Sequence, residues 1–144
     1  MADKEKILKL LNQILEVELA GVVRYTHYSL MVFGYARIPI VSWLRSQATE
    51  SLTHAHRAGE LITQMEGYPS LKIGKLLDSH KNDIKTILEE SLAHENFGLN
   101  AYQDLLDVVK NDPELVFLEE YARELITEEE MHIGDVEKML RKPD

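Results

Sequence analysis

The chain has 144 residues, a length that fits one domain over residues 1–144 with a hydrophobic core of its own. Its formal charge of −9 disfavours nucleic acid or an anionic membrane as a main partner and suits a protein that attracts cations. The absence of cysteine excludes disulfides, thiolate-held metal clusters and thiol nucleophiles, and the lack of a long apolar run or an export signal predicts a cytoplasmic protein without a transmembrane helix.

The first predicted helix follows Asp3, a plausible N-cap, and extends to about Gly34. Apolar residues recur along it at helical spacing and form one seam. Glu18 interrupts this seam because it lies between Ile14 and Val22. A carboxylate on a face that should be buried needs a partner, and a cation would supply one.

A second helix is predicted from about Pro39, which suits a first helical turn, to the breakers Gly67 and Pro69. His54 lies on this helix, and Glu50 precedes it by four residues. Both side chains are candidates for the same polar site as Glu18.

The segment from Gly67 to about Lys81 has no helical pattern and is long for a connection in a compact helical domain. It is long enough to run back along a helix of roughly 40 Å. We therefore expect a four-helix bundle with one long crossover, in which the second and third helices are parallel.

The third helix is predicted to start near Asn82 or Asp83 and to end near Lys110, with Glu95 as the single carboxylate in its apolar seam. Asn111 suits a helix end. The turn that follows predicts Asp112 as the N-cap and Pro113 as the first residue of a fourth helix.

The fourth helix is predicted to continue to about Leu140, which leaves no room for a fifth helix. Glu129 and His132 are three residues apart on it and therefore share one helix face. That face continues as an apolar stripe, so both groups are expected to point inward.

The two halves of the chain repeat one arrangement. Glu18 precedes His54 by 36 residues, and Glu95 precedes His132 by 37 residues, each pair across a helical hairpin. This is the plan of bundle cores that hold two metal ions, in which carboxylates bridge the ions and each ion takes an imidazole nitrogen. The predicted ligands are Glu18, Glu50, His54, Glu95, Glu129 and His132.

The plan expects a glutamate three residues before each histidine, and before His54 that residue is Ser51. Glu50 lies one residue earlier and can still reach the site, directly or through a local π-bulge. Without Glu50 the centre would have five ligands and would be weakened.

The remaining ionisable groups are not among the predicted metal ligands. Glu128 and Glu130 are expected to be solvated surface groups. Tyr25 lies two turns beyond Glu18 and is expected to donate a hydrogen bond within the site. Four further histidines are expected at the surface or around the ligands: His27, His56, His80 and His94.

Several stretches of the sequence resemble bacterioferritin, in order and spacing, over nearly the whole chain. They are LNQILEVELAGVVRYTHY (11–28), THAHR (53–57), EGYPSL (66–71), LAHENFGLN (92–100) and EEMHI (129–133). The resemblance implies an all-α, ferritin-like fold, with Glu18, His54, Glu95, Glu129 and His132 as di-iron ligands and Tyr25 as the site tyrosine. It also implies a ferroxidase, which oxidises paired Fe(II) with O2 or H2O2 and passes Fe(III) on for storage.

Three departures from the family pattern limit what it implies. Ser51 stands at the position of a bridging glutamate, while Glu50 matches an acidic residue that serves an inner-surface iron site in some members. Leu52 replaces the methionine that ligates haem, so haem is not expected. The missing fifth helix leaves a dimer or another closed homo-oligomer in competition with the 24-subunit cage.

Three functions remain in competition. The first is the iron-oxidising storage enzyme, with two iron ions per subunit. The second is a non-catalytic iron-binding or structural subunit in which Ser51 impairs the centre. The third is a rubrerythrin-like peroxidase, which would need an external reductant because the chain has no cysteine to hold an electron-delivering iron.

Overall fold

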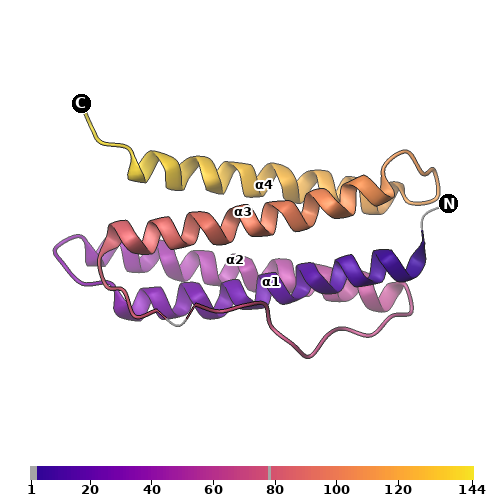
Figure 1. Cartoon of the computed structure of the whole chain (residues 1–144), viewed down its shortest axis with the longest axis horizontal. Helices are drawn as coiled ribbons and strands as arrows, with labels where there is room; N and C mark the ends of the chain where they lie inside the picture. The colour runs from indigo at the N-terminus through magenta and orange to yellow at the C-terminus, as the bar shows by residue number, and fades with distance from the viewer. Residues whose placement is uncertain (1–2, 78) are drawn as a thin grey trace.

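The computed structural model describes residues 3–77 and 79–144, and within them the chain forms four helices and no strand. The helices are α1 (Lys4–Met31), α2 (Arg37–Gln64), α3 (Ile84–Val109) and α4 (Val116–Leu140). They lie along a common long axis, and α2 and α3 run in the same direction (Figure 1). The all-α bundle and the parallel arrangement of α2 and α3 are as predicted. No helix in the described part of the chain could cross a membrane.

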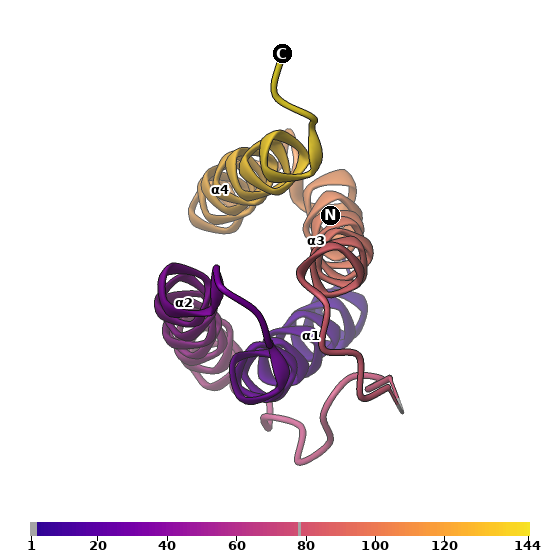
Figure 2. The ribbon, with the colours of Figure 1, turned by 90° about the vertical axis from the view of Figure 1, so that its left-hand side faces the viewer.

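The segment between α2 and α3 runs back along the bundle beside α1 (Figures 1 and 2). Its backbone is tied to α1 at several points: Gly74 N donates to Glu16 O at 2.7 Å, and Ser70 N donates to Asn12 Oδ1 at 2.7 Å. Arg24 adds a third link through its guanidinium, which donates to Lys75 O at 2.7 Å. The long crossover expected from the sequence is therefore held against α1 between Ser70 and Lys75.

Helix ends agree with the predicted caps except at α4. Asp3 accepts from Glu5 N and Asp83 accepts from Thr86 N, each at 3.0 Å, as N-caps should. The prediction that Pro113 begins α4 was wrong, because Asp112 caps a separate turn through Glu114 N, and the helix starts only at Val116.

The core consists of two apolar clusters separated along the bundle. One cluster, near the start of α1 and the end of α3, includes Ile7, Leu11 and Leu105. The other, near the end of α1, includes Tyr25, Tyr28 and Leu44. On α1, Glu18 lies between these two clusters, so the polar residues described next are enclosed by packed apolar side chains on either side.

Candidate metal centre

Each of the four helices places one carboxylate or imidazole side chain deep in the interior of the bundle. These residues are 3–6% exposed, and they are Glu18 on α1, His54 on α2, Glu95 on α3 and Glu129 on α4. His132 lies one turn beyond Glu129 and is partly buried. Glu18 and Glu95 are buried, as their interruption of apolar seams predicted, and Glu129 is buried on the face of α4 that was predicted to point inward.

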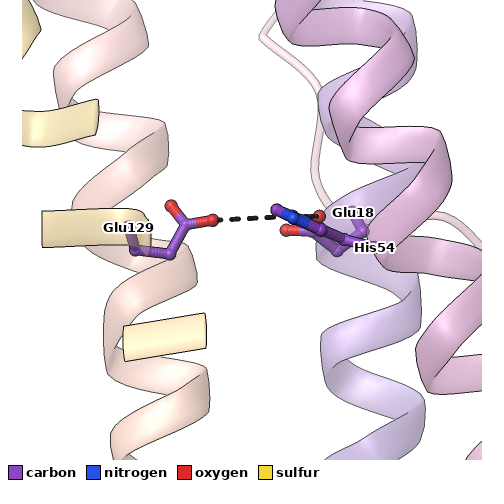
Figure 3. A group of neighbouring side chains, drawn as sticks. All are labelled: Glu18, His54 and Glu129. Carbon is purple, nitrogen blue, oxygen red and sulfur yellow. Dashed lines mark hydrogen bonds and ion pairs between the residues drawn. The ribbon is translucent and has the colours of Figure 1, made fainter. Parts of the chain in front are cut away.

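Glu18, His54 and Glu129 form the first group of converging side chains (Figure 3). His54 Nδ1 lies 3.0 Å from Glu18 Oε2 and 4.0 Å from Glu129 Oε1. Three helices therefore bring two carboxylates and one ring nitrogen together in a space shielded from water.

Glu95, Glu129 and His132 form the second group, whose ligand atoms lie within 4.8 Å of one another. The Tyr25 hydroxyl donates a short hydrogen bond to Glu95 Oε1, as expected for the site tyrosine. Because Glu129 belongs to both groups, its carboxylate lies between two potential ion positions, and its Oε2 is buried without a hydrogen-bond partner in the described residues.

Glu50, His54 and Glu128 form a third group of converging ligand atoms at the rim of the first two, and the side chains of Glu50 and Glu128 are 36% and 37% exposed. Glu50 Oε1 is 3.1 Å from His132 Nε2 and 3.8 Å from His54 Nε2. Glu128 Oε2 is 3.0 Å from His54 Nε2, so the prediction that Glu128 is merely a solvated surface group was wrong. Its spacing held the signal, because Glu128 precedes His132 by four residues as Glu50 precedes His54.

Ser51 is buried against α1 at Gly21. A methyl group added to Gly21 would lie 2.8 Å from Ser51 Oγ and 3.0 Å from His94 Nε2. His94 is one of the histidines expected around the ligands, and burial lowers its pKa to about 4, so the ring is neutral. Of the others, His56 is exposed, and His27 contacts the backbone of the crossover at Ser79 O.

In the metal-free centre, burial favours the protonated forms of the carboxylates. It raises the pKa of Glu129 to about 12, assisted by a hydrogen bond and charge repulsion from Glu95. The pKa of Glu18 is also raised, mainly by burial. Burial opposes the charged form of Glu95 as well, but hydrogen bonds from Glu129 and Tyr25 outweigh it and lower the pKa. Burial lowers the pKa of His54, yet the hydrogen bond to Glu18 and its charge raise it overall.

The donor set fits a pair of divalent transition-metal ions. Three buried carboxylates and two imidazoles are the oxygen and nitrogen donors that Fe(II), Mn(II) and Zn(II) accept, and a cation would replace the protons that burial now requires. The unpartnered Oε2 of Glu129 is the kind of buried atom that such an ion would satisfy.

Four long helices around a buried layer of carboxylates and imidazoles define the class of carboxylate-centred four-helix bundles. The chain belongs to the ferritin-like family, because residues 8–144 match its ferritin-like domain. A bacterioferritin of Brucella melitensis is 29% identical to it over 145 residues, covering 97% of this chain and 86% of that protein.

Two solved structures illustrate the likeness of fold. The bacterioferritin of Rhodobacter capsulatus, described with a metal-free dinuclear site and a haem iron, has a TM-score of 0.86 at 23% identity, covering 97% of this chain and 86% of that one. A dodecameric thioferritin of Bacteroides fragilis, described as bacterioferritin-related, has a TM-score of 0.84 at 21% identity, covering 96% and 86%.

Proposed function

We propose that the protein is a bacterioferritin-like ferroxidase that takes up Fe(II), oxidises it to Fe(III) and hands it on for storage. The observation that carries this proposal is the pair of ligand groups that share Glu129. Such sharing would hold two ions close enough to give up one electron each to the same oxidant. Membership of the ferritin-like family supports a role in iron storage.

Five inward-facing side chains would bind the Fe(II) substrate, with Glu50 at the rim as the sixth predicted ligand; the five are Glu18, His54, Glu95, Glu129 and His132. Two Fe(II) ions, one H2O2 and two protons give two Fe(III) ions and two water molecules, and with O2 in its place the product is H2O2. Carboxylates suit this reaction because their hard anionic oxygens stabilise Fe(III) more than Fe(II). Tyr25 holds the Glu95 carboxylate in place through its hydrogen bond.

Anaerobic titration with Fe(II), followed by addition of O2 or H2O2, tests the proposal. We expect about two Fe(II) per chain to be bound and oxidised in a fast phase before any slower mineral growth. Absence of a saturable fast phase with either oxidant, in protein that binds Fe(II), would contradict the assignment as a ferroxidase.

The position of Ser51 favours a second candidate, a non-catalytic iron-binding subunit. Ser51 has no carboxylate, and its Oγ packs at Gly21. The centre therefore has one anionic ligand fewer than the symmetric plan. In this case the protein would bind Fe(II) without accelerating its oxidation, and the titration above separates the two functions.

We further propose a cytoplasmic homo-oligomer without haem at Leu52, whose exposed side chain on α2 offers no sulfur ligand. Large apolar side chains lie exposed around the start of α2, at Phe33, Tyr35 and Ile38, as expected for a surface covered by another subunit. The dodecamer formed by the thioferritin supports a closed assembly. Light scattering of the purified protein measures the number of subunits.

A further inference from the structure

Two residues beside Gly21 distinguish the first helical hairpin from the second. The second hairpin repeats the first with an offset of 77 or 78 positions, which matches Gly21 with Gly98. The residues beside the two glycines are matched in the same way, Val17 with His94 and Glu129 with Ser51. A carboxylate and a valine therefore lie beside Gly98, whereas a hydroxyl and an imidazole lie beside Gly21.

The imidazole nitrogen beside Gly21 stands where the repeat has a candidate ligand oxygen. A methyl group on Gly21 would lie 3.0 Å from His94 Nε2, and a methyl group on Gly98 would lie 3.9 Å from Glu129 Oε2. That oxygen belongs to the carboxylate shared by two ligand groups, and it has no hydrogen-bond partner in the described residues. The repeat therefore gives His94 a position equivalent to that of a ligand.

The same nitrogen approaches the first ligand group, to which Glu18 and His54 belong. Gly21 lies three residues beyond Glu18 on α1 and therefore shares its helix face. Ser51, whose Oγ lies 2.8 Å from the same methyl position, precedes His54 by three residues on α2. His94 on α3 thus contacts positions that are one helical turn away from two predicted ligands.

The His94 ring has room to turn toward that group. It lines a hollow of about 210 Å³ between α1, α3 and the crossover, together with small side chains such as Ala20 and Ala93. It also meets the Tyr25 ring edge-on, with the ring centroids 6.0 Å apart. In the structure His94 lies outside the groups of converging ligand atoms, so we expect metal binding to turn the ring. Because part of the ring borders the hollow, this turn displaces few packed neighbours.

The proposed pair of ions lacks one donor of the symmetric plan. That plan has two shared carboxylates, and here Glu129 provides one while Ser51 cannot provide the other. Imidazole nitrogen is a good ligand for both iron and zinc. We propose that His94 supplies the missing donor, with its Nε2 binding the ion held by Glu18 and His54. This inference rests on the metal centre of the proposed function, but not on the oxidation of iron.

Zn(II) affinity tests the assignment without redox chemistry. The variants are His94→Val, which removes the nitrogen, His94→Val combined with Ser51→Glu, which supplies a carboxylate instead, and His56→Val as a control at an exposed histidine of α2. We expect one of the two Zn(II) ions to bind at least about 10-fold more weakly in H94V, to recover affinity in S51E/H94V, and to be unaffected in H56V. Equal Zn(II) affinities in H94V and H56V would overturn the proposal.

The His94 ring can also be observed in the native protein by ¹⁵N NMR of the histidine-labelled chain. A metal ion binds a ring nitrogen through its lone pair, so binding changes the resonance of that nitrogen. We expect Zn(II) to move the Nε2 resonance of His94 to the position of a metal-bound nitrogen and to leave the resonances of exposed His56 unchanged. A His94 spectrum that saturating Zn(II) does not alter would mean that the ring only fills space, and would overturn the inference.

The ligand role of His94 and the ferroxidase activity can fail independently. If Zn(II) binds Nε2 of His94 but Fe(II) is oxidised with neither O2 nor H2O2, the ferroxidase proposal fails and the ligand role stands. If Fe(II) is oxidised rapidly and Zn(II) leaves the His94 ring unchanged, the ligand role fails alone. A native protein that binds neither metal would overturn both.

Discussion

The two helical hairpins, α1–α2 and α3–α4, can be compared residue by residue because the second repeats the first with an offset of 77 or 78 positions. Both present an inward carboxylate on the first helix, a histidine on the second and a rim glutamate four residues before that histidine. The matching pairs are Glu18 and Glu95, His54 and His132, Glu50 and Glu128, Gly21 and Gly98, and Tyr25 and Tyr102.

The repeat breaks at one place, where Ser51 of α2 stands opposite Glu129 of α4. Beside Gly98, a methyl group would lie 3.9 Å from Glu129 Oε2 and 3.7 Å from Val17 Cγ1. Beside Gly21, the corresponding space holds Ser51 Oγ at 2.8 Å and His94 Nε2 at 3.0 Å. The imidazole of His94, which matches Val17, thus fills room that a second shared carboxylate would need.

Because Ser51 stands opposite Glu129, the two halves of the centre carry unequal negative charge. The α3–α4 hairpin contributes two buried carboxylates, Glu95 and Glu129, whereas the α1–α2 hairpin contributes Glu18 alone. Glu129 is then the single shared carboxylate of the proposed pair of ions. The predictions below test this inequality.

The largest effect is expected from Glu129→Gln. Gln keeps the size of the side chain but removes the negative charge shared by both ligand groups, so the rate of Fe(II) oxidation should fall by more than about 100-fold. The matched control is Ser51→Ala at the equivalent position of the other hairpin, which should change the rate by less than about threefold because Ser51 is no ligand. Stopped-flow absorbance measures both rates, and similar losses in the two variants would contradict the inequality.

Ser51→Glu would give both hairpins the same residue at this position, but we expect it to destabilise the fold through crowded packing. The longer side chain must share the space beside Gly21 with His94, so the free energy of unfolding should fall by about 1–3 kcal/mol. Adding His94→Val, which copies Val17, should recover part of that loss because the smaller side chain frees the space. Urea denaturation of the metal-free single and double variants measures both changes.

The double variant also separates the two proposed functions. If the native protein oxidises Fe(II) at a negligible rate and S51E/H94V oxidises it faster, the result favours the non-catalytic subunit. A fast native rate that the double variant leaves unchanged would favour the ferroxidase with a single shared carboxylate.

Stability of the metal-free protein should fall as the pH rises from about 5 to 8. The folded-state pKa of Glu129 is raised to about 12, so above the unfolded value of 4.5 the folded chain binds a proton that the unfolded chain has lost, and stability decreases with pH. The raised pKa values of Glu18 and His54 act in the same direction, and the lowered pKa of Glu95 opposes them. Thermal melts in a chelator should show the decline, at roughly 4 °C per kcal/mol.

The control for this pH effect is E129Q, in which position 129 no longer titrates. Its melting temperature should vary less between pH 5 and 8 than that of the native chain. If the native protein became more stable over this range, the metal-free centre would tolerate ionised carboxylates. Burial would then not be what sets their protonation.

Much of this arrangement could be predicted from the sequence because a single carboxylate in an apolar helix seam is conspicuous. Glu18 and Glu95 were found in this way, and the spacing to the two histidines gave the hairpins. Seam periodicity does not single out Glu128, because three successive acids precede Met131. Only its spacing of four residues before His132, which matches that of Glu50 before His54, indicates that it turns toward the site. The position of His94 beside Ser51 could not be predicted from the sequence either, because it depends on how the helices pack around Gly21.

The smallest effect is expected from Tyr25→Phe. The Tyr25 hydroxyl donates to Glu95 inside the bundle, so its loss leaves a buried acceptor unsatisfied and should lower the free energy of unfolding by about 1–2 kcal/mol. Its counterpart Tyr102 is equally buried, but its hydroxyl makes no well-aligned hydrogen bond in the described residues, so Tyr102→Phe should cost less. Urea denaturation compares the two variants, and an equal loss in both would mean that the hydroxyl of Tyr25 contributes packing alone and does not hold the Glu95 carboxylate.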